Sequence, residues 1–253
     1  MLPTVPERAR PRKAKERALG RREALYLLVL LAFTVLNMLQ VSSIRIGTEF
    51  RPYPFLVWNL FLAWVPVAFQ LLLAQLYTYR KSGIRTLGLL VTGAGWLFFY
   101  PNAAYLVTDL LHVFARYPVN PDRYFWHEQA FWTHLFALLL TAMIGLVISS
   151  YSLRAVHRLV RERMGAWRGA LFAGVVLALS SFGIYLGRFL RLNSWDVLFN
   201  PRSLVGELVS VLNPSRYSFL FSFCGGMFLI MLLTYIGFIW MEDRQRESFS
   251  EDN

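Results

Sequence analysis

The segment GWLFFYPNAAYLVTDLLHVFAR, residues 95–116, decides how this chain folds. It is apolar enough to lie in a membrane, yet it contains a proline and several polar residues. Its polar positions are spaced by three, four, three and four residues: Asn102, Tyr105, Asp109, His112 and Arg116. That spacing predicts one helix with all five side chains on a single face. We expect this face to look into a polar pocket at the outer side of a membrane.

The composition is typical of a polytopic membrane protein. The chain has 253 residues, of which 56% are hydrophobic and 16% charged, whereas soluble proteins carry about 25% charged residues. Its mean hydropathy is +0.43. The apolar residues form runs of about twenty, the length that crosses a roughly 30 Å hydrocarbon core as a helix. The single cysteine, Cys224, excludes an intramolecular disulfide.

Six such runs predict an all-α transmembrane fold, a six-helix polytopic bundle. The expected spans cover residues 24–44, 54–77, 84–116, 129–151, 167–190 and 217–240. Pro101 should bend the third span because proline cannot donate a backbone hydrogen bond. The domain organisation is then a basic tail, a transmembrane domain and a C-terminal tail, over residues 1–23, 24–240 and 241–253.

The last outer loop carries a shorter apolar pattern. Asn200-Pro201 is typical of a helix start, and apolar residues recur at helical spacing up to Asn213-Pro214. About eleven residues are too few to cross the membrane. This pattern predicts a short amphipathic interfacial helix in the last outer loop.

The distribution of basic residues predicts the orientation. Lys and Arg number eighteen in the tails and loops of the predicted inner side, against eight in the outer loops. This asymmetry favours a membrane protein with both termini in the cytoplasm. The basic N-terminal tail is expected to rest on anionic lipid of the bilayer, and nucleic-acid binding is not expected.

Polar residues from three spans are expected to meet near the outer surface. The helical rise of about 1.5 Å per residue places Asn59, Asp109 and Arg188 at similar depth. Charges at that depth usually pair, so Asp109 should pair with Arg188 or Arg191. The expected ligand-binding residues are Asn59, Asn102, Tyr105, Arg188, Arg191, Asn193, Trp195 and Asp196. Within the first span, Asn37 and Gln40 suit a helix–helix hydrogen bond.

The chemistry of this group of residues leaves three functions open. Arginines that bind a small anionic solute or a lipid headgroup would suit a binding or transport protein, with Asp109 and His112 relaying protons. Asp109 or His112 as general base would instead suit an enzyme acting on a lipid-linked substrate. The same groups could serve only as structural ion pairs. Asp109 and His112 could also ligate a metal, but no metal-binding motif supports this, and no cofactor is expected.

Three runs carry a resemblance to a known family. The sequence WLFFYPNAAYLVTDLLH at 96–112 resembles the signature of an uncharacterised bacterial membrane family, the domain-of-unknown-function 1361 family. The runs NLFLAWVP at 59–66 and GRFLRLNSWD at 187–196 are similar to its other recurring segments. The likeness covers roughly residues 25–240. It implies a multi-pass inner-membrane protein and brings no activity with it.

Overall fold

The computed structural model describes residues 20–47, 50–117, 124–190 and 214–251. This part of the chain is helical apart from turns and one isolated bridge between Ile46 and Phe50. The elements are α2 Arg21–Ser43, α3 Pro54–Thr78, α4 Gly83–Phe99, α5 Pro101–Tyr105, η1 Thr108–Leu111, α6 His112–Arg116, η2 Phe125–His127, α7 Gln129–Met164, α8 Ala166–Phe189 and α11 Pro214–Glu251.

Six helical segments of the described chain are long and apolar enough to cross a membrane, with α4 to α6 together forming the third. The predicted six-helix all-α transmembrane fold is therefore confirmed. The expected interfacial helix at 200–213 and most of the basic tail lie outside the described residues. So do Arg191, Asn193, Trp195 and Asp196.

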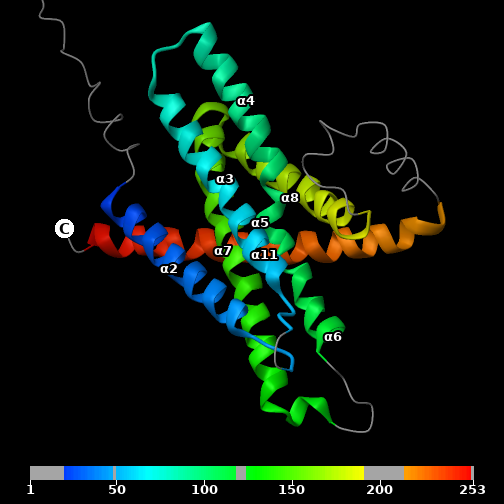
Figure 1. The fold of residues 1–253 in the computed structure, drawn as a ribbon. Coiled ribbons are helices and arrows are strands. Elements are labelled where there is room, and N and C mark those ends of the chain that lie inside the picture. Colours follow the sequence, from blue (N-terminus) through cyan, green and yellow to red (C-terminus); the bar gives the residue numbers. More distant parts are fainter. Residues whose placement is uncertain (1–19, 48–49, 118–123, 191–213, 252–253) are drawn as a thin grey trace, which may run out of the picture.

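The helices cross one another around α7 (Figure 1). Helix α7 is the most buried of the six spans and packs against α2, α3, α5, α8 and α11. Helix α11 runs across α7 and α8 rather than alongside them. The start of α2 and the end of α11 lie near each other, because Glu23 and Glu242 both contact Arg158 of α7. Both ends of the helical region therefore reach the same side of the molecule.

The third span is broken, so the expectation of one continuous helix with five polar residues on one face is wrong. Helix α4 ends at Phe99, two residues before Pro101, which has no backbone N–H to donate. The Asn102 amide donates to the Phe99 carbonyl oxygen at 3.1 Å. Thr108–Leu111 then winds as a 3-10 helix, which has about three residues per turn instead of 3.6. The change in winding turns Asp109 away from the face expected of an α-helix.

The region expected as a loop at 151–168 is also helical. Helix α7 continues for thirteen residues past the predicted end at 151, to Met164, and α8 begins at Ala166. Only Gly165 interrupts them, with a φ of 90° that L side chains rarely adopt. The reason is that residues 152–164 include good helix formers and contact α11, so the helix does not end where the apolar run does.

One polar contact joins α2 to α7 inside the apolar core. The Asn37 side-chain amide donates to the carbonyl oxygen of Ala137 at 3.0 Å, and the Thr141 hydroxyl donates to Asn37 Oδ1 at 2.7 Å. Asn37 is fully buried. The prediction that Asn37 makes a helix–helix hydrogen bond is confirmed.

Glycines set the closest approaches between helices. A Cβ at Gly145 of α7 would lie 2.3 Å from the carbonyl oxygen of Ala103 in α5, and one at Gly183 of α8 would lie 3.1 Å from Pro101. These two glycines fix the broken third span between α7 and α8. Gly174 of α8 differs, because no atom of the described residues lies within 4 Å of a Cβ built there.

Replacing Gly145 by alanine should destabilise the protein by about 1–3 kcal/mol, because the new methyl group meets backbone rather than a movable side chain. Unfolding in mixed detergent micelles, followed by tryptophan fluorescence, measures this loss. Gly174→Ala is the matched control and should be neutral or stabilising by up to about 1 kcal/mol, through helix propensity. Equal loss in both variants would contradict the packing argument.

Replacing Asn37 by alanine should destabilise the protein by about 1 kcal/mol, since the α2–α7 hydrogen bonds are lost in an apolar setting. The same unfolding assay applies. Gln40→Ala, one turn further along α2 at a partly exposed position, is the control and should change little. An Asn37→Ala variant as stable as the Gln40→Ala variant would show that the contact contributes nothing.

Candidate functional site

Asp109 lies at the centre of a polar cluster made by three spans. It belongs to η1, and its side chain is only 2% exposed. Oδ2 accepts a hydrogen bond from the Asn59 amide of α3 at 2.8 Å. Oδ1 accepts one from Arg188 Nη1 of α8 at 3.4 Å. Both carboxylate oxygens therefore have a donor, as a buried charge requires.

This geometry confirms the predicted pairing of Asp109 with Arg188. It also confirms that the second, third and fifth spans meet at one level. In the sequence, Asn59 lies 50 positions before Asp109, and Arg188 lies 79 positions after it. The local sequence explains the contacts. The break at Pro101 and the 3-10 turn bring Asp109 towards α3 and α8, and Gly183 lets Pro101 approach α8.

His112 extends the cluster towards solvent or headgroups. Its Nδ1 lies 3.1 Å from the backbone carbonyl oxygen of Asp109 and 3.6 Å from Oδ1 of the same residue. Its ring packs against Phe55 of α3, with the centroids 4.5 Å apart. The side chain is 20% exposed, so His112 joins a buried carboxylate to a more accessible region. Arg116 ends α6 one turn further on.

Two of the expected site residues have other contacts. The Asn102 amide donates to the Phe99 carbonyl oxygen at the helix break, and the Tyr105 ring packs against the largest apolar cluster. The structure therefore uses Asn102 to satisfy a backbone carbonyl that α4 leaves unpaired. Within the described part of the chain, neither side chain makes a hydrogen bond or ion pair with Asp109.

A second polar group near the start of α7 was missed by sequence reasoning. The Tyr53 hydroxyl lies 2.8 Å from His134 Nδ1, and the Tyr117 hydroxyl donates to Glu128 Oε2 at 2.5 Å. Burial raises the pKa of the Tyr53 hydroxyl to about 12, so this hydroxyl is protonated at neutral pH. The rings of Tyr117 and His134 also touch. The signal in the sequence was His134, a histidine within an apolar run.

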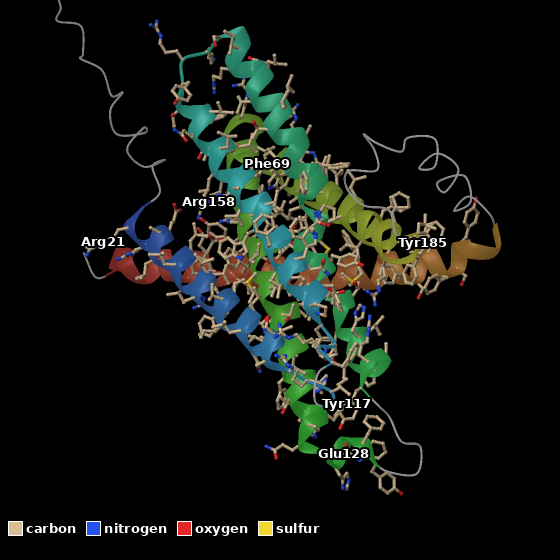
Figure 2. All side chains as sticks on the ribbon, viewed as in Figure 1. Arg21, Phe69, Tyr117, Glu128, Arg158 and Tyr185 are labelled. Atoms are coloured by element: carbon tan, nitrogen blue, oxygen red, sulfur yellow. The ribbon has the colours of Figure 1, made fainter. Side chains whose placement is uncertain are left out.

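The two groups share one end of the molecule. Figure 2 shows Tyr117 and Glu128 at the end where α7 begins, whereas Arg21 and Arg158 lie towards the other side. The aromatic contact between Phe55 and Tyr53 links the Asp109 cluster to the Tyr53–His134 pair. The end of the molecule that carries Asp109 is therefore rich in groups that donate, accept or move protons.

The cluster suits an anion or a proton better than a metal ion. Asp109 and His112 are two possible metal ligands, but no group of three His, Cys, Asp or Glu side chains suited to a metal occurs among the described residues. Asn59 and Arg188 occupy the Asp109 oxygens as donors. The arrangement can hold one negative charge next to a cation and can exchange a proton through His112.

Comparison with known proteins supports the resemblance carried by the sequence motifs. No curated protein and no solved structure matches the chain. The family described as "Protein of unknown function (DUF1361)" matches residues 58–233, well over half of the chain. The matched range includes Asn59, Asp109 and Arg188, the three residues that meet at the centre of the cluster. This chain, a six-span helical membrane protein, therefore belongs to the DUF1361 family of proteins of unknown function.

Proposed function

We propose that this protein binds a small anion, either a free solute or a lipid headgroup, at a polar pocket around Arg188, and transports it. The observation that carries the proposal is the buried Arg188–Asp109 pair between three spans. Arginine has five N–H donors and suits phosphate or carboxylate groups. Among the described residues, Arg188 makes one side-chain hydrogen bond, from Nη1 to Asp109 at 3.4 Å, so its other N–H groups can serve a ligand, and the side chain is 18% exposed.

The carboxylate of Asp109 acts as a built-in competitor for the anion. While Asp109 is ionised, it holds the Arg188 guanidinium. A proton on Asp109 removes this competition and frees Arg188 for a ligand anion. Proton binding and anion binding then favour each other, and by linkage the effect is reciprocal. The charged and titratable groups around Asp109 are His112, Arg188 and Arg116, and His112 is placed to pass the proton.

The proposed setting is a bacterial inner membrane with both chain ends in the cytoplasm. The excess of Lys and Arg in the predicted inner segments supports this orientation. It is also supported by the meeting of α2, α7 and α11 at one side through Glu23, Arg158 and Glu242. The Asp109 cluster would then face the outside of the cell, and the basic tail would rest on anionic lipid.

A second candidate is an enzyme that acts on a lipid-linked substrate. It is favoured by the position of His112 beside Asp109, with Nδ1 3.6 Å from Oδ1, because a carboxylate next to an imidazole can orient it as a general base. This alternative requires turnover in detergent without any ion gradient, and that turnover should be lost in His112→Gln. The binding protein requires no turnover.

Replacing Asp109 by asparagine should increase the affinity for anions, because the competitor for Arg188 loses its charge. Arg188→Gln should abolish binding and destabilise the protein by about 3 kcal/mol, since it leaves Asp109 buried without its cation. Thermal stability of the purified protein measures both, with inorganic phosphate, glycerol 3-phosphate and acetate as probes. A probe present at a hundred times its dissociation constant adds about 2.7 kcal/mol to the free energy of unfolding.

The pH dependence separates this mechanism from simple charge attraction. Binding of the probes to the wild type should strengthen as the pH falls, because Asp109 takes up a proton, whereas binding to Asp109→Asn should change much less. His112→Gln controls for a positive charge gained by the imidazole. Stabilisation by glycerol 3-phosphate alone would favour a headgroup, and stabilisation by phosphate as well would favour a free solute. If no probe stabilises the wild type or Asp109→Asn, the cluster is a structural ion pair.

A further inference from the structure

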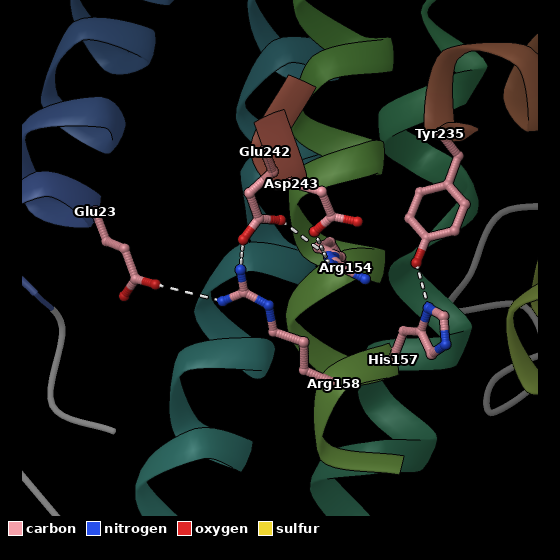
Figure 3. A network of polar contacts seen from close by, with 7 residues as sticks. All are labelled: Glu23, Arg154, His157, Arg158, Tyr235, Glu242 and Asp243. Carbon is pink, nitrogen blue, oxygen red and sulfur yellow. Dashed lines mark hydrogen bonds and ion pairs between the residues drawn. The ribbon is translucent and has the colours of Figure 1, made fainter. Parts of the chain in front are cut away.

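A network of charged contacts closes the side of the molecule away from Asp109. Figure 3 shows Arg154 and Arg158 of α7 between Glu242 and Asp243 of α11 and Glu23 of α2. Arg154 Nε donates to Glu242 Oε2 at 2.9 Å, and its Nη2 donates to Asp243 Oδ1 at 3.3 Å. Arg158 pairs with Glu242, and with Glu23 at 3.7 Å. We call these five residues the inner latch.

The latch holds one face of α11 against α7. His157 Nδ1 lies 2.6 Å from the Tyr235 hydroxyl, and both side chains are buried. Glu242 and Asp243 follow Tyr235 by seven and eight residues, which is about two helical turns. All three therefore lie on one face of α11. Arg154 is only 6% exposed, so separating α11 from α7 would uncover a charge that the contact now hides.

The rest of the α11 contact is made by apolar and weakly polar groups. At its other end, Phe219 and Phe223 pack on Tyr185 and Phe189 of α8. Met227 and Met231 lie in the same buried cluster as Trp96 and Tyr100. Among the described residues, the ion pairs between α11 and other helices are those of the latch. Opening at the latch would therefore leave the aromatic end of α11 attached to α8.

The interior next to this contact is polar for a membrane bundle. The Ser149 hydroxyl donates to the Tyr100 hydroxyl at 2.8 Å, and Trp96 Nε1 donates to Ser152 Oγ at 2.9 Å. Among the described residues, His157 Nε2 and Ser180 Oγ are buried without a protein hydrogen-bond partner. Buried polar atoms of this kind are often paired with water. A polar solute could pass such a surface more easily than an apolar one.

Two adjacent glycines divide α11 between its aromatic end and the latch. No atom of the described residues lies within 4 Å of a Cβ built on Gly225 or on Gly226, so close packing among these residues does not explain the two glycines. Glycine weakens a helix interior, and glycine pairs are common places for helices to bend. The pair follows Cys224, whose Sγ contacts the Ser181 carbonyl oxygen of α8 at 3.7 Å.

We propose that α11 is the moving element of the transporter and that the inner latch is its gate. Bending at Gly225–Gly226 swings the second half of α11 away from α7, separates Glu242 and Asp243 from Arg154, and opens the side opposite the Asp109 cluster. The phenylalanines before the hinge hold the first half of α11 on α8. This inference rests on the proposed transport of an anion, because only a transported ligand needs an exit on the second side.

Distance measurements between α7 and α11 test the gate directly. In a full-length Cys224→Ser protein in lipid nanodiscs, spin labels replace Met164 at the end of α7 and Met241 on α11, both more than half exposed. Glu242→Gln removes a partner of both arginines. In this variant we expect a second population of molecules with a longer distance between the two labels. Its share should be well above roughly 10%, the upper range for a minor conformational state. Glu23→Gln loosens only α2 and should leave the distance between the labels unchanged.

The hinge has its own matched control. Adding Gly225→Ala and Gly226→Ala to Glu242→Gln should suppress the long-distance population. Gly237→Ala lies in equally open space on α11 and should not suppress it. If circular dichroism shows that Glu242→Gln is folded and the distance between the labels is unchanged, the proposal that the latch holds α11 against α7 is wrong. Equal suppression by Gly237→Ala overturns the hinge.

Binding of inorganic phosphate to the same samples keeps the two proposals apart. If phosphate stabilises the protein and α11 does not move, the gate is wrong while the anion site stands. If α11 moves and phosphate neither binds nor accumulates in proteoliposomes, the anion function is wrong. If both hold, the double alanine hinge variant should bind phosphate as the wild type does and lose most of its uptake.

Discussion

The structure depends on one buried charge. Asp109 lies in the third span with almost no exposure, where an unpaired carboxylate would be strongly unfavourable, so a cation and a donor must reach it. Arg188 and Asn59 do so from two other spans. That requirement fixes the rotation of α3 and α8 relative to the third span. It also brings the second, third and fifth spans together at one end of the bundle, where the proposed anion site lies.

The broken third span is what makes this contact possible. A straight helix through residues 84–116 would place Asn102, Tyr105 and Asp109 on a common face. Instead, α4 ends before Pro101, and the Asn102 amide donates a hydrogen bond to the Phe99 carbonyl oxygen. A separate short helix, α5, begins at Pro101. Gly145 and Gly183 then allow the short helix α5 to pack closely between α7 and α8. Irregular backbone within a membrane is tolerated when it is buried in protein, and here Ala103, Ala104 and Leu106 are fully buried.

The two ends of the bundle differ in how their charges are arranged. At the Asp109 end, the described residues place the Asp109–Arg188 ion pair beside aromatic and histidine side chains. At the other end, two arginines are shared among three carboxylates from two helices. The first arrangement suits recognition of an anion. The second suits a contact that holds helices together and can be exchanged for contacts with water when they separate.

The sequence alone predicted the number of spans, since the thickness of the bilayer requires about twenty apolar residues for each. It also predicted the pairing of Asp109 with Arg188, because helical rise places both at one depth, and the α2–α7 contact of Asn37. Only the tertiary structure decided that Asn102 and Tyr105 turn to other partners, that α7 and α8 continue through an expected loop, and that Arg154 meets Glu242 and Asp243. Those outcomes depend on helix rotation and crossing, which close backbone contacts such as Gly145 with Ala103 set between residues far apart in the chain.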